Sequence, residues 1–325
     1  MNSRETLEMA ERKVEITPEK SMTEHSRDEK GASARRWGPG ARLGVIGGLG
    51  EMGGMFAQFF RNQGYVVEVA DRATEVTNEE VIQTSDVVVF AVPLHETEAI
   101  IRELAPLARP DQLLMDLTSL KTGPVREMLC SRASVVGLHP MFGGRTSSFV
   151  GQTMVACPAR IDGEDWTRLR GLFTGAGMRV KESAPEEHDR MMSIIQVLFH
   201  MTTMLTGRIL RDLDVNIEET LEYTSPSYRI EMSLLGRIFA QNGLLYSAIT
   251  QMNPYTKELI EKFRSGLNLY EEWCDAKDLN AFVSDFERSA EHLGDFCRQA
   301  YRESSAILNL AVQSASQNKE SARAD

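Results

Sequence analysis

Three glycines stand near the start of the apolar part of the chain, in the order Gly48-x-Gly50-x-x-Gly53. They follow the apolar run LGVIG and precede a helix-length segment, GMFAQFFRNQG. Asp71 ends the next apolar run, at about the spacing where such loops place a carboxylate against a ribose. Glycines in this setting let backbone N–H groups and a helix N-terminus approach a pyrophosphate. The pattern predicts a dinucleotide site, and the alternative is an ordinary strand-to-helix turn with a surface aspartate.

Asp71 also bears on which dinucleotide would bind. Its carboxylate would accept hydrogen bonds from the adenosine ribose and repel a 2′-phosphate, so NAD is the predicted cofactor. Arg72 beside it would soften that preference. We expect Gly48 to permit the tight turn and Gly53 to let the helix pack close to the strand. The full set of predicted cofactor-binding residues is Gly48, Gly50, Glu51, Met52, Gly53, Asp71, Arg72, Val92, Pro93 and Ser119.

Polar side chains follow two further apolar runs. Ser119 and Lys121 come after LLMDLT, and His139 ends the run SVVGLHP. The carboxyl ends of parallel strands meet at one edge of a sheet, and ligands bind there. The residues at these run ends are therefore expected to surround the reactive centre, although a histidine or serine at such a turn can also serve as a helix cap.

The elements that must position these residues change type near Pro185. From Leu43 onward, Val-rich runs of four to eight residues alternate with helix-length segments, which is typical of a doubly wound parallel sheet of the Rossmann type. After Pro185 the pattern is that of long amphipathic helices. We predict a tail over residues 1–40, a Rossmann domain over 41–184, an all-α substrate and dimerisation domain over 185–312, and a second tail over 313–325.

The first helix of the second domain is apolar almost all round, which predicts burial in a homodimer interface. Gln196 and His200 lie four residues apart on it and share one face. Buried polar groups need partners, and a substrate in a cleft between the domains would supply them. The alternative for His200 is an ordinary core histidine. His188-Asp189, at the start of this helix, is interpreted as a structural cap and hinge.

Composition excludes several classes of function. The 325 residues carry a formal net charge of −11 without a basic stripe, so no nucleic-acid partner is expected. No apolar run reaches the roughly 20 residues that a membrane helix needs, and the charged start is not a signal peptide, so we expect a cytoplasmic protein without a membrane partner. The four cysteines are far apart in sequence, so neither a metal site nor a disulfide framework is predicted.

Several motifs together carry a family resemblance. GLHPMFG, DLTS.K, EHD and SPSYRIEMSLLGRIFAQ occur in the family's arrangement, and the likeness covers roughly residues 43–310. In these motifs the chain resembles the prephenate dehydrogenase family, in particular the dehydrogenase half of bifunctional chorismate mutase/prephenate dehydrogenases. The first 40 residues are too few and too polar for the mutase half, so no mutase activity is expected.

The resemblance implies an NAD-dependent oxidative decarboxylation of a cyclohexadienyl acid such as prephenate. A neutral His139 would accept the proton of the 4-hydroxyl, and Ser119 would bind the same oxygen or orient the imidazole. Arg237 matches the arginine with which the family anchors a substrate carboxylate, while an interhelical ion pair is its alternative. Arg229 lies eight residues earlier and projects near the same face. Tyr246 matches an aromatic position that closes the family's pocket.

Two kinds of alternative remain at this stage. The family also handles arogenate and 4-amino-4-deoxyprephenate; the presence of His139 favours a 4-hydroxyl substrate, and the overall resemblance favours prephenate. A non-catalytic NAD-sensing protein on the same two domains is the alternative of another class. Such a protein would be expected to lose the hydride-site residues, whereas Ser119, His139 and Arg237 are all present.

Overall fold

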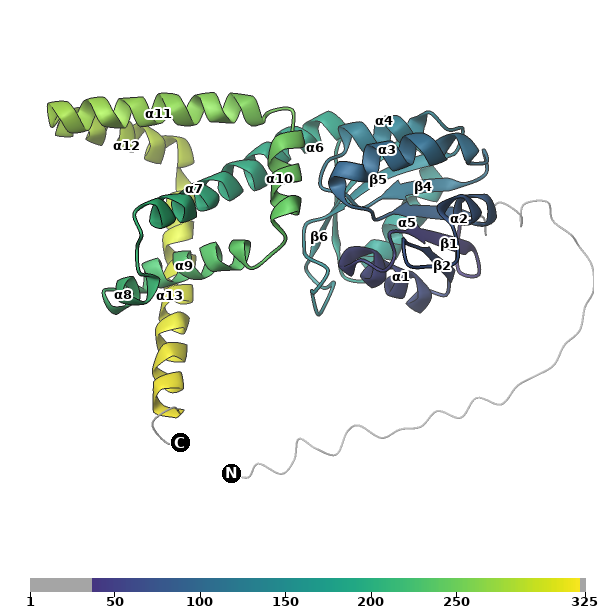
Figure 1. The fold of residues 1–325 in the computed structure, drawn as a ribbon, viewed down its shortest axis with the longest axis horizontal. Coiled ribbons are helices and arrows are strands. Elements are labelled where there is room, and N and C mark those ends of the chain that lie inside the picture. The colour runs from purple at the N-terminus through teal and green to yellow at the C-terminus, as the bar shows by residue number, and fades with distance from the viewer. Residues whose placement is uncertain (1–36, 322–325) are drawn as a thin grey trace, which may run out of the picture. The chain divides into compact units, whose positions relative to one another are not determined.

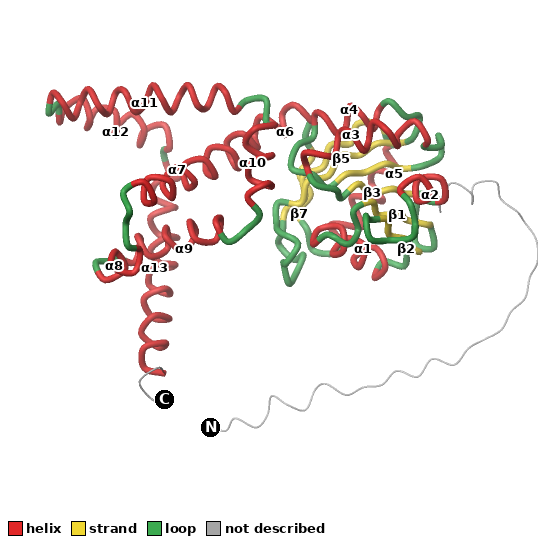
Figure 2. The backbone as a smooth tube through the Cα atoms, viewed as in Figure 1, coloured by secondary structure: helices red, strands yellow, loops and turns green. Residues whose placement is uncertain are grey.

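The computed structural model describes residues 37–321 of the chain. Strands and helices alternate as far as Glu182, and from Pro185 onward the described chain is helical (Figure 1). The same division is visible in Figure 2, where the strands gather in the first part and the second part consists of helices and loops. The expected domain boundary at 184/185 falls in the connection between the last strand and the helix that begins at Pro185.

The seven strands form one sheet in the order β2-β1-β3-β4-β5-β6-β7. Their bounds are β1 (Arg42–Ile46), β2 (Val66–Ala70), β3 (Val87–Phe90), β4 (Leu113–Asp116), β5 (Ser134–Pro140), β6 (Thr153–Arg160) and β7 (Arg179–Glu182). Neighbours among β1 to β5 pair in parallel, as predicted.

The expectation of a wholly parallel sheet needs one correction. β6 pairs antiparallel with β5, and β7 pairs in parallel with β6, so the last two strands run opposite to the others. A parallel connection normally requires a crossover helix. The segment 141–152 between β5 and β6 contains no helix, and the chain returns directly beside β5.

Helices cover both faces of the sheet. They are α1 (Glu51–Asn62), α2 (Asn78–Thr84), α3 (Leu94–Leu104) with the short 3-10 helix η3 (Ala105–Leu107), α4 (Thr122–Leu129) and α5 (Gly163–Gly175). Val87 and Val89 of β3 pack with α1 and α5 in one buried cluster. Val88 and Phe90 of the same strand pack with α2, α3 and α4 in the other. This alternation confirms the doubly wound fold, because each central strand is buried on both faces.

The order of the strands fixes where a ligand can bind. β1 lies between β2 and β3, so the chain leaves β1 toward one edge of the sheet and then returns to the other side. Sheets of this kind bind ligands in the crevice beyond the carboxyl ends of the strands, at the point where the direction reverses. That point is the pair of loops after β1 and β3.

The helical part begins with α6 (Pro185–Met192), a π-helical segment η4 (Ser193–Leu198) and α7 (Phe199–Asp212). It continues through α8 (Ile217–Glu222), α9 (Pro226–Phe239), α10 (Gly243–Met252), α11 (Thr256–Ala276), α12 (Leu279–Leu293) and α13 (Asp295–Ser321). Many of its large apolar side chains are exposed in the single chain, among them Phe199 at 63%, Leu213 at 70% and Phe286 at 67%. No helix within residues 37–321 is long and apolar enough to cross a membrane.

The predicted tails need two corrections. Residues 37–40 belong to the sheet domain, because the hydroxyl of Tyr65 donates to the carbonyl of Trp37 at 2.6 Å and Gly40 N–H donates to the Gly64 carbonyl at 2.8 Å. Residues 313–321 continue α13, since the polar sequence there contains no glycine or proline that would end a helix. Residues 1–36 and 322–325 of the predicted tails lie outside the described residues.

Candidate active site

The glycine loop joins β1 to α1 by a tight turn. The left-handed backbone conformation falls on Gly47, with φ +83°, and a Cβ on Gly48, the next residue of the turn, would lie 2.5 Å from a Val69 methyl group. A Cβ on Gly53 would lie 2.3 Å from the Gly47 carbonyl oxygen, so α1 can approach the loop this closely because residue 53 has no side chain. Gly50 is exposed, and as the N-cap it has no side chain that could cover the N–H groups of the first helical turn. The loop therefore forms a cradle of the kind that binds a pyrophosphate.

The other predicted cofactor residues lie around this loop. Asp71 follows β2, and its carboxylate accepts a hydrogen bond from Leu49 N–H in the glycine loop at 3.0 Å. A Cβ on Gly47 would lie 2.7 Å from the Ala91 carbonyl oxygen, so the loops after β1 and β3 touch. Pro93 is the N-cap residue of α3, directly after this contact. The residues at the reversal point thus fit a dinucleotide lying from the end of β2 across β1 to β3.

His139 is the buried centre of a second group of residues. It lies near the end of β5 with 4% of its surface exposed. Its Nδ1 lies 2.9 Å from Nε2 of His188 on α6. The Nδ1 of His188 lies 2.7 Å from a carboxylate oxygen of Asp189. Two imidazoles and a carboxylate are thereby linked in a row, from the first helix of the helical domain to the strand end.

Backbone groups fix Asp189 at the far end of this row. Its carboxylate oxygens accept hydrogen bonds from the N–H groups of Lys121 at 2.7 Å and Thr122 at 2.9 Å, at the start of α4. The side-chain amide of Asn253 donates to the Asp189 carbonyl at 2.8 Å. Asp189 therefore caps a helix of the sheet domain. The interpretation of His188-Asp189 as a cap was correct for Asp189, but α4 is the helix that it caps.

The row of hydrogen bonds determines which nitrogen of each ring carries hydrogen. An ionised Asp189 only accepts, so Nδ1 of His188 is the donor and its Nε2 becomes an acceptor. That acceptor receives the Nδ1–H of His139. The remaining nitrogen of His139, Nε2, is then a free base with a lone pair, which is the form that can take a proton from an alcohol.

A buried ion pair lies beneath His139. The Lys121 ammonium contacts the Asp116 carboxylate, and both side chains are fully buried. Lys121 also donates to the carbonyl oxygen of Leu138 at 2.8 Å, next to His139 in β5. Thr118 donates from its hydroxyl to the same Asp116 carboxylate at 2.5 Å. The second Asp116 oxygen has no hydrogen-bond partner among the described residues. Lys121 thus ties β4 to β5 at the strand ends.

The local charges and burial act on the pKa values of this group. Burial holds the pKa of His139 well below its ordinary value of 6.5, and electrostatic interactions with the neighbouring His188 and with the Lys121 ammonium lower it further. Burial also lowers the pKa of His188, against the opposing hydrogen bond to Asp189. Burial by itself raises the pKa of Asp189, but its hydrogen bonds from His188, Thr122 and Lys121 outweigh this and lower it. Near neutral pH the row holds neutral imidazoles ending on a carboxylate.

One polar side chain, that of Gln196, faces His139 from the helical domain. The π-helical segment η4 carries Gln196, whose amide nitrogen lies 3.4 Å from the free Nε2 of His139. Buried atoms without a hydrogen-bond partner in the described part of the chain are Gln196 Oε1, His200 Nδ1 and Thr250 Oγ1. The rings of His200 and Tyr246 pack edge to face at 4.8 Å. Orphaned buried polar atoms are costly, and they mark a place for a polar ligand.

The structure brings some of the predicted substrate residues together and leaves others apart. Gln196 lies against His139 and His200 packs on Tyr246, and Gln196 and His200 are four residues apart along η4 and α7. Arg237 on α9 is exposed, and its charge lowers the pKa of Tyr246 against the larger raising effect of burial. Ser119 is half-buried after β4, with no hydrogen bond recorded for its side chain in the described residues.

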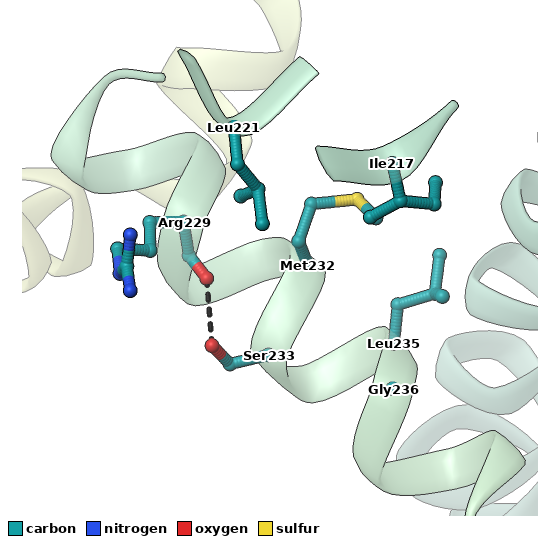
Figure 3. A pocket seen from close by; sticks show the side chains of 7 residues that line it. All are labelled: Ile217, Leu221, Arg229, Met232, Ser233, Leu235 and Gly236. Carbon is teal, nitrogen blue, oxygen red and sulfur yellow. Dashed lines mark hydrogen bonds between the residues drawn. The ribbon is translucent and has the colours of Figure 1, made fainter. Parts of the chain in front are cut away.

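Arg229 lies elsewhere. It lines a pocket of about 290 Å³ formed by α8 and α9, together with Ile217, Leu221, Met232, Ser233, Leu235 and Gly236. Figure 3 shows the apolar side chains of this pocket turned toward one another while the Arg229 guanidinium points away from them. None of these lining residues belongs to the group around His139, so the prediction that Arg229 shares a site with Arg237 finds no support in this contact.

Sequence reasoning did not pair His188 with His139 or Asp116 with Lys121, and it did not single out Thr250, whose buried hydroxyl lacks a partner in the described residues. The adjacent titratable residues His188 and Asp189, placed directly after the last strand, were the available signal. Asp116 and Lys121 were visible in the motif DLTS.K, but a motif does not say which of its side chains pair. Nothing in the sequence around Thr250 distinguishes it from other helix threonines.

A nucleotide-binding sheet joined to a helical domain, with a buried imidazole where the two meet, defines a two-domain dehydrogenase. The family model "Prephenate dehydrogenase, nucleotide-binding domain" matches residues 58–182, and "Prephenate dehydrogenase, dimerization domain" matches residues 184–288. The chain belongs to the prephenate dehydrogenase family, which confirms the resemblance seen in the sequence. The first match begins after the glycine loop, so the interpretation of that loop rests on its own geometry.

Proteins with similar sequences agree with this assignment. The T-protein of Haemophilus influenzae is 32% identical over 271 residues, which cover 83% of this chain and 72% of that protein. The probable arogenate/prephenate dehydrogenase of Methanocaldococcus jannaschii is 33% identical over 85% of this chain and 67% of its own length. The 4-amino-4-deoxyprephenate dehydrogenase of Streptomyces pristinaespiralis is 27% identical over 78% of this chain and 92% of its own length.

Solved structures share the fold. The arogenate dehydrogenase of Synechocystis superposes with a TM-score of 0.60 at 18% identity, covering 80% of this chain and 99% of that one. The prephenate dehydrogenase of A. aeolicus in complex with hydroxyphenyl propionate and NAD+ gives a TM-score of 0.58 at 19% identity, covering 78% and 98%. These likenesses confirm the Rossmann-type domain followed by a helical domain.

Proposed function

We propose that the protein catalyses the NAD-dependent oxidative decarboxylation of prephenate to 4-hydroxyphenylpyruvate. The observation that supports this most directly is the unprotonated Nε2 of His139, held as a base at the strand ends beside Gln196, whose amide oxygen lacks a partner in the described residues. A substrate with a hydroxyl to deprotonate and further polar groups to bind matches such a site.

NAD is the proposed cofactor. The glycine loop would hold the pyrophosphate at the start of α1, and Asp71 would bind the adenosine ribose. The loops after β1 and β3 would flank the nicotinamide, with Val92 and Pro93 on the β3 side. When bound, NAD supplies the acceptor for the hydride that leaves the ring carbon bearing the hydroxyl.

His139 would act as the general base that accepts the proton of the 4-hydroxyl. As the hydride leaves C4, Nε2 takes the hydroxyl proton and a carbonyl forms. The ring carboxylate then leaves as carbon dioxide, and its bonding electrons complete the aromatic ring and generate a phenolate. The imidazolium returns its proton to the phenolate oxygen. His139 therefore accepts the proton and later returns it to the product, so the imidazole is neutral again at the end of the cycle.

His188 and Asp189 would act as positioning residues. They hold the Nδ1 of His139 as the donor, which keeps Nε2 as the acceptor throughout. When His139 becomes positively charged, the Asp189 carboxylate at the end of the row stabilises the charge through His188. The positive charge of Lys121 disfavours protonation of His139, so it helps to keep His139 neutral before the reaction.

The helical domain would hold the substrate. Arg237 is proposed to grip a carboxylate as a bidentate ligand, and Gln196, His200 and Thr250 would hydrogen-bond the remaining polar groups. Tyr246 closes the pocket over His200. Ser119 is proposed to approach the substrate hydroxyl from the end of β4. The exposed apolar faces of the helical domain are proposed to pair with a second copy of the chain, giving a homodimer.

A comparison of substrates tests the proposal. Prephenate, arogenate and 4-amino-4-deoxyprephenate would be offered in parallel with NAD, and kcat/KM would be measured from NADH formation. We expect prephenate to be preferred, because a 4-amino group can assist hydride loss from its own lone pair and would not need His139. A preference for arogenate would reassign the side-chain end of the substrate. No NADH from any of the three would favour the non-catalytic alternative.

A further inference from the structure

An arginine, Arg72, directly follows the aspartate proposed to bind the ribose, and it is held by a glutamate of helix α3. The guanidinium of Arg72 donates to both carboxylate oxygens of Glu96, at 2.7 Å each. Glu96 lies in the first turn of α3 and is about one-third exposed. Both hydrogen bonds come from one nitrogen, Nη2, so the contact holds this end of the guanidinium at the Glu96 carboxylate.

The position of this pair relates it to the cofactor crevice. Arg72 follows β2 and Glu96 follows β3, while β1 lies between these two strands in the sheet. The ion pair therefore bridges the strand ends on either side of the glycine loop. On the β2 side, the Asp71 carboxylate accepts from Arg72 N–H at 2.7 Å and from Leu49 N–H at 3.0 Å. The Arg72 side chain extends from the place where an adenosine ribose would lie.

An arginine in this place would normally weaken discrimination between the two dinucleotides. A free guanidinium beside the ribose provides a ligand for a 2′-phosphate, and Asp71 alone would have to oppose it. Glu96 changes that balance in two ways. It engages the Nη2 donors of Arg72, and it adds a second negative charge at the rim of the crevice.

We infer that Glu96 is a specificity-determining residue, which selects NAD against NADP by holding Arg72 away from the 2′-position. The inference rests on the proposed dinucleotide site and is independent of the substrate. It predicts that the neutral variant Glu96→Gln releases Arg72 and gains affinity for nucleotides with a 2′-phosphate.

Binding of two adenosine nucleotides tests this without any turnover. Adenosine 2′,5′-bisphosphate carries the 2′-phosphate of NADP, and 5′-AMP lacks it; both would be titrated calorimetrically into the full chain at low ionic strength, where exposed charges are least screened. We expect Glu96→Gln to bind the bisphosphate about tenfold more tightly, the gain of one charge-assisted contact, with less than a twofold change for 5′-AMP.

Two further variants test whether Arg72 causes the gain in affinity for the bisphosphate. Glu98→Gln is the matched control on α3, because the Glu98 carboxylate pairs with Arg126 at 3.0 Å; it should bind both nucleotides as the wild type does. Adding Arg72→Gln to Glu96→Gln should abolish the gain. The inference would be overturned if Glu96→Gln bound the bisphosphate no more tightly than the wild type does. It would also be overturned if the gain in affinity remained after Arg72→Gln was added. Either result would leave the proposed NAD preference intact. A wild-type chain that binds the bisphosphate more tightly than 5′-AMP would overturn both.

Discussion

The Nδ1 of His139 lies 2.9 Å from the Nε2 of His188, although 49 residues and a change of domain separate them in the chain. This contact couples the proposed base to the first helix of the helical domain. Because His188 is in turn bound to Asp189, and Asp189 to the start of α4, the orientation of the base depends on how the two domains are joined. The first prediction concerns this coupling.

Replacing His188 by glutamine or leucine separates its hydrogen bond from its bulk. The amide oxygen of the introduced glutamine can still accept from His139 Nδ1–H, whereas leucine leaves that donor without a partner. We expect His188→Leu to lower kcat by about 10²-fold or more and His188→Gln to recover much of the loss, with KM changed little in both. Nitrogen NMR of labelled histidines reports the tautomer directly, and His139 should carry its hydrogen on Nδ1 in the wild type. Hydrogen on Nε2 would contradict the proposed row.

Acid should destabilise the fold through the same residues. Burial holds the pKa values of His139 and His188 below 6.5 in the folded chain, while both regain ordinary values on unfolding. Below about pH 6.5 the unfolded chain binds protons that the folded chain does not, so the free energy of unfolding decreases as the pH falls toward the folded pKa values. The lowered pKa of Asp189 extends the loss to lower pH.

Urea unfolding between pH 7 and pH 5 measures this dependence. The wild type should lose stability steadily over this interval, and His139→Asn should show a shallower slope because one depressed histidine has been removed. Equal stability at both ends of the interval in the wild type would show that the two histidines are not held neutral by the fold.

Arg237 and Arg229 provide a matched pair on α9. A carboxylate contact present before the reaction contributes to binding, so Arg237→Ala should raise KM for prephenate by about tenfold or more while kcat changes less. Arg229 lines the pocket between α8 and α9, and Arg229→Ala should leave KM near the wild-type value. If Arg229→Ala raises KM and Arg237→Ala does not, the two arginines have been assigned in the wrong order.

The exposed apolar side chains of the helical domain predict association. Phe199, Leu213 and Phe286 each expose more than 60% of their surface in the single chain, and such side chains rarely gather on the surface of a monomer. Analytical ultracentrifugation of the full chain should find a dimer at micromolar concentration. A monomer at this concentration would mean that these helices fold back on their own chain in solution.

The cofactor half of the site could be predicted from the sequence because it is local. The glycine loop and Asp71 lie within about 25 residues of each other, and their spacing follows from one strand-helix-strand unit. Even there, the positive φ belongs to Gly47, which precedes the three glycines of the pattern, since a spacing pattern does not specify backbone angles. The reversed direction of β6 was also hidden, because a strand's apolar run is the same in either direction.

The substrate half depends on contacts between distant segments. His139 could be singled out by its place at a strand end, but its pairing with His188 depends on how α6 packs against β5. The π-helical segment that carries Gln196 has no sequence mark that distinguishes it from an ordinary helix. Arg237 and Tyr246 were placed in one site through the family resemblance, and the effect of Arg237 on the pKa of Tyr246 indicates that the two are near each other.

Turnover of prephenate by His139→Asn tests the central claim most directly. If Nε2 takes the hydroxyl proton as hydride leaves, its contribution is concentrated in the transition state, so kcat should fall by roughly 10²- to 10⁴-fold with little change in KM. In the wild type, kcat/KM should decrease on the acid side with a pKa below 6.5, and this limb should be absent in the variant. Near wild-type kcat in His139→Asn, with the acid limb intact, would contradict the assignment of His139 as the base.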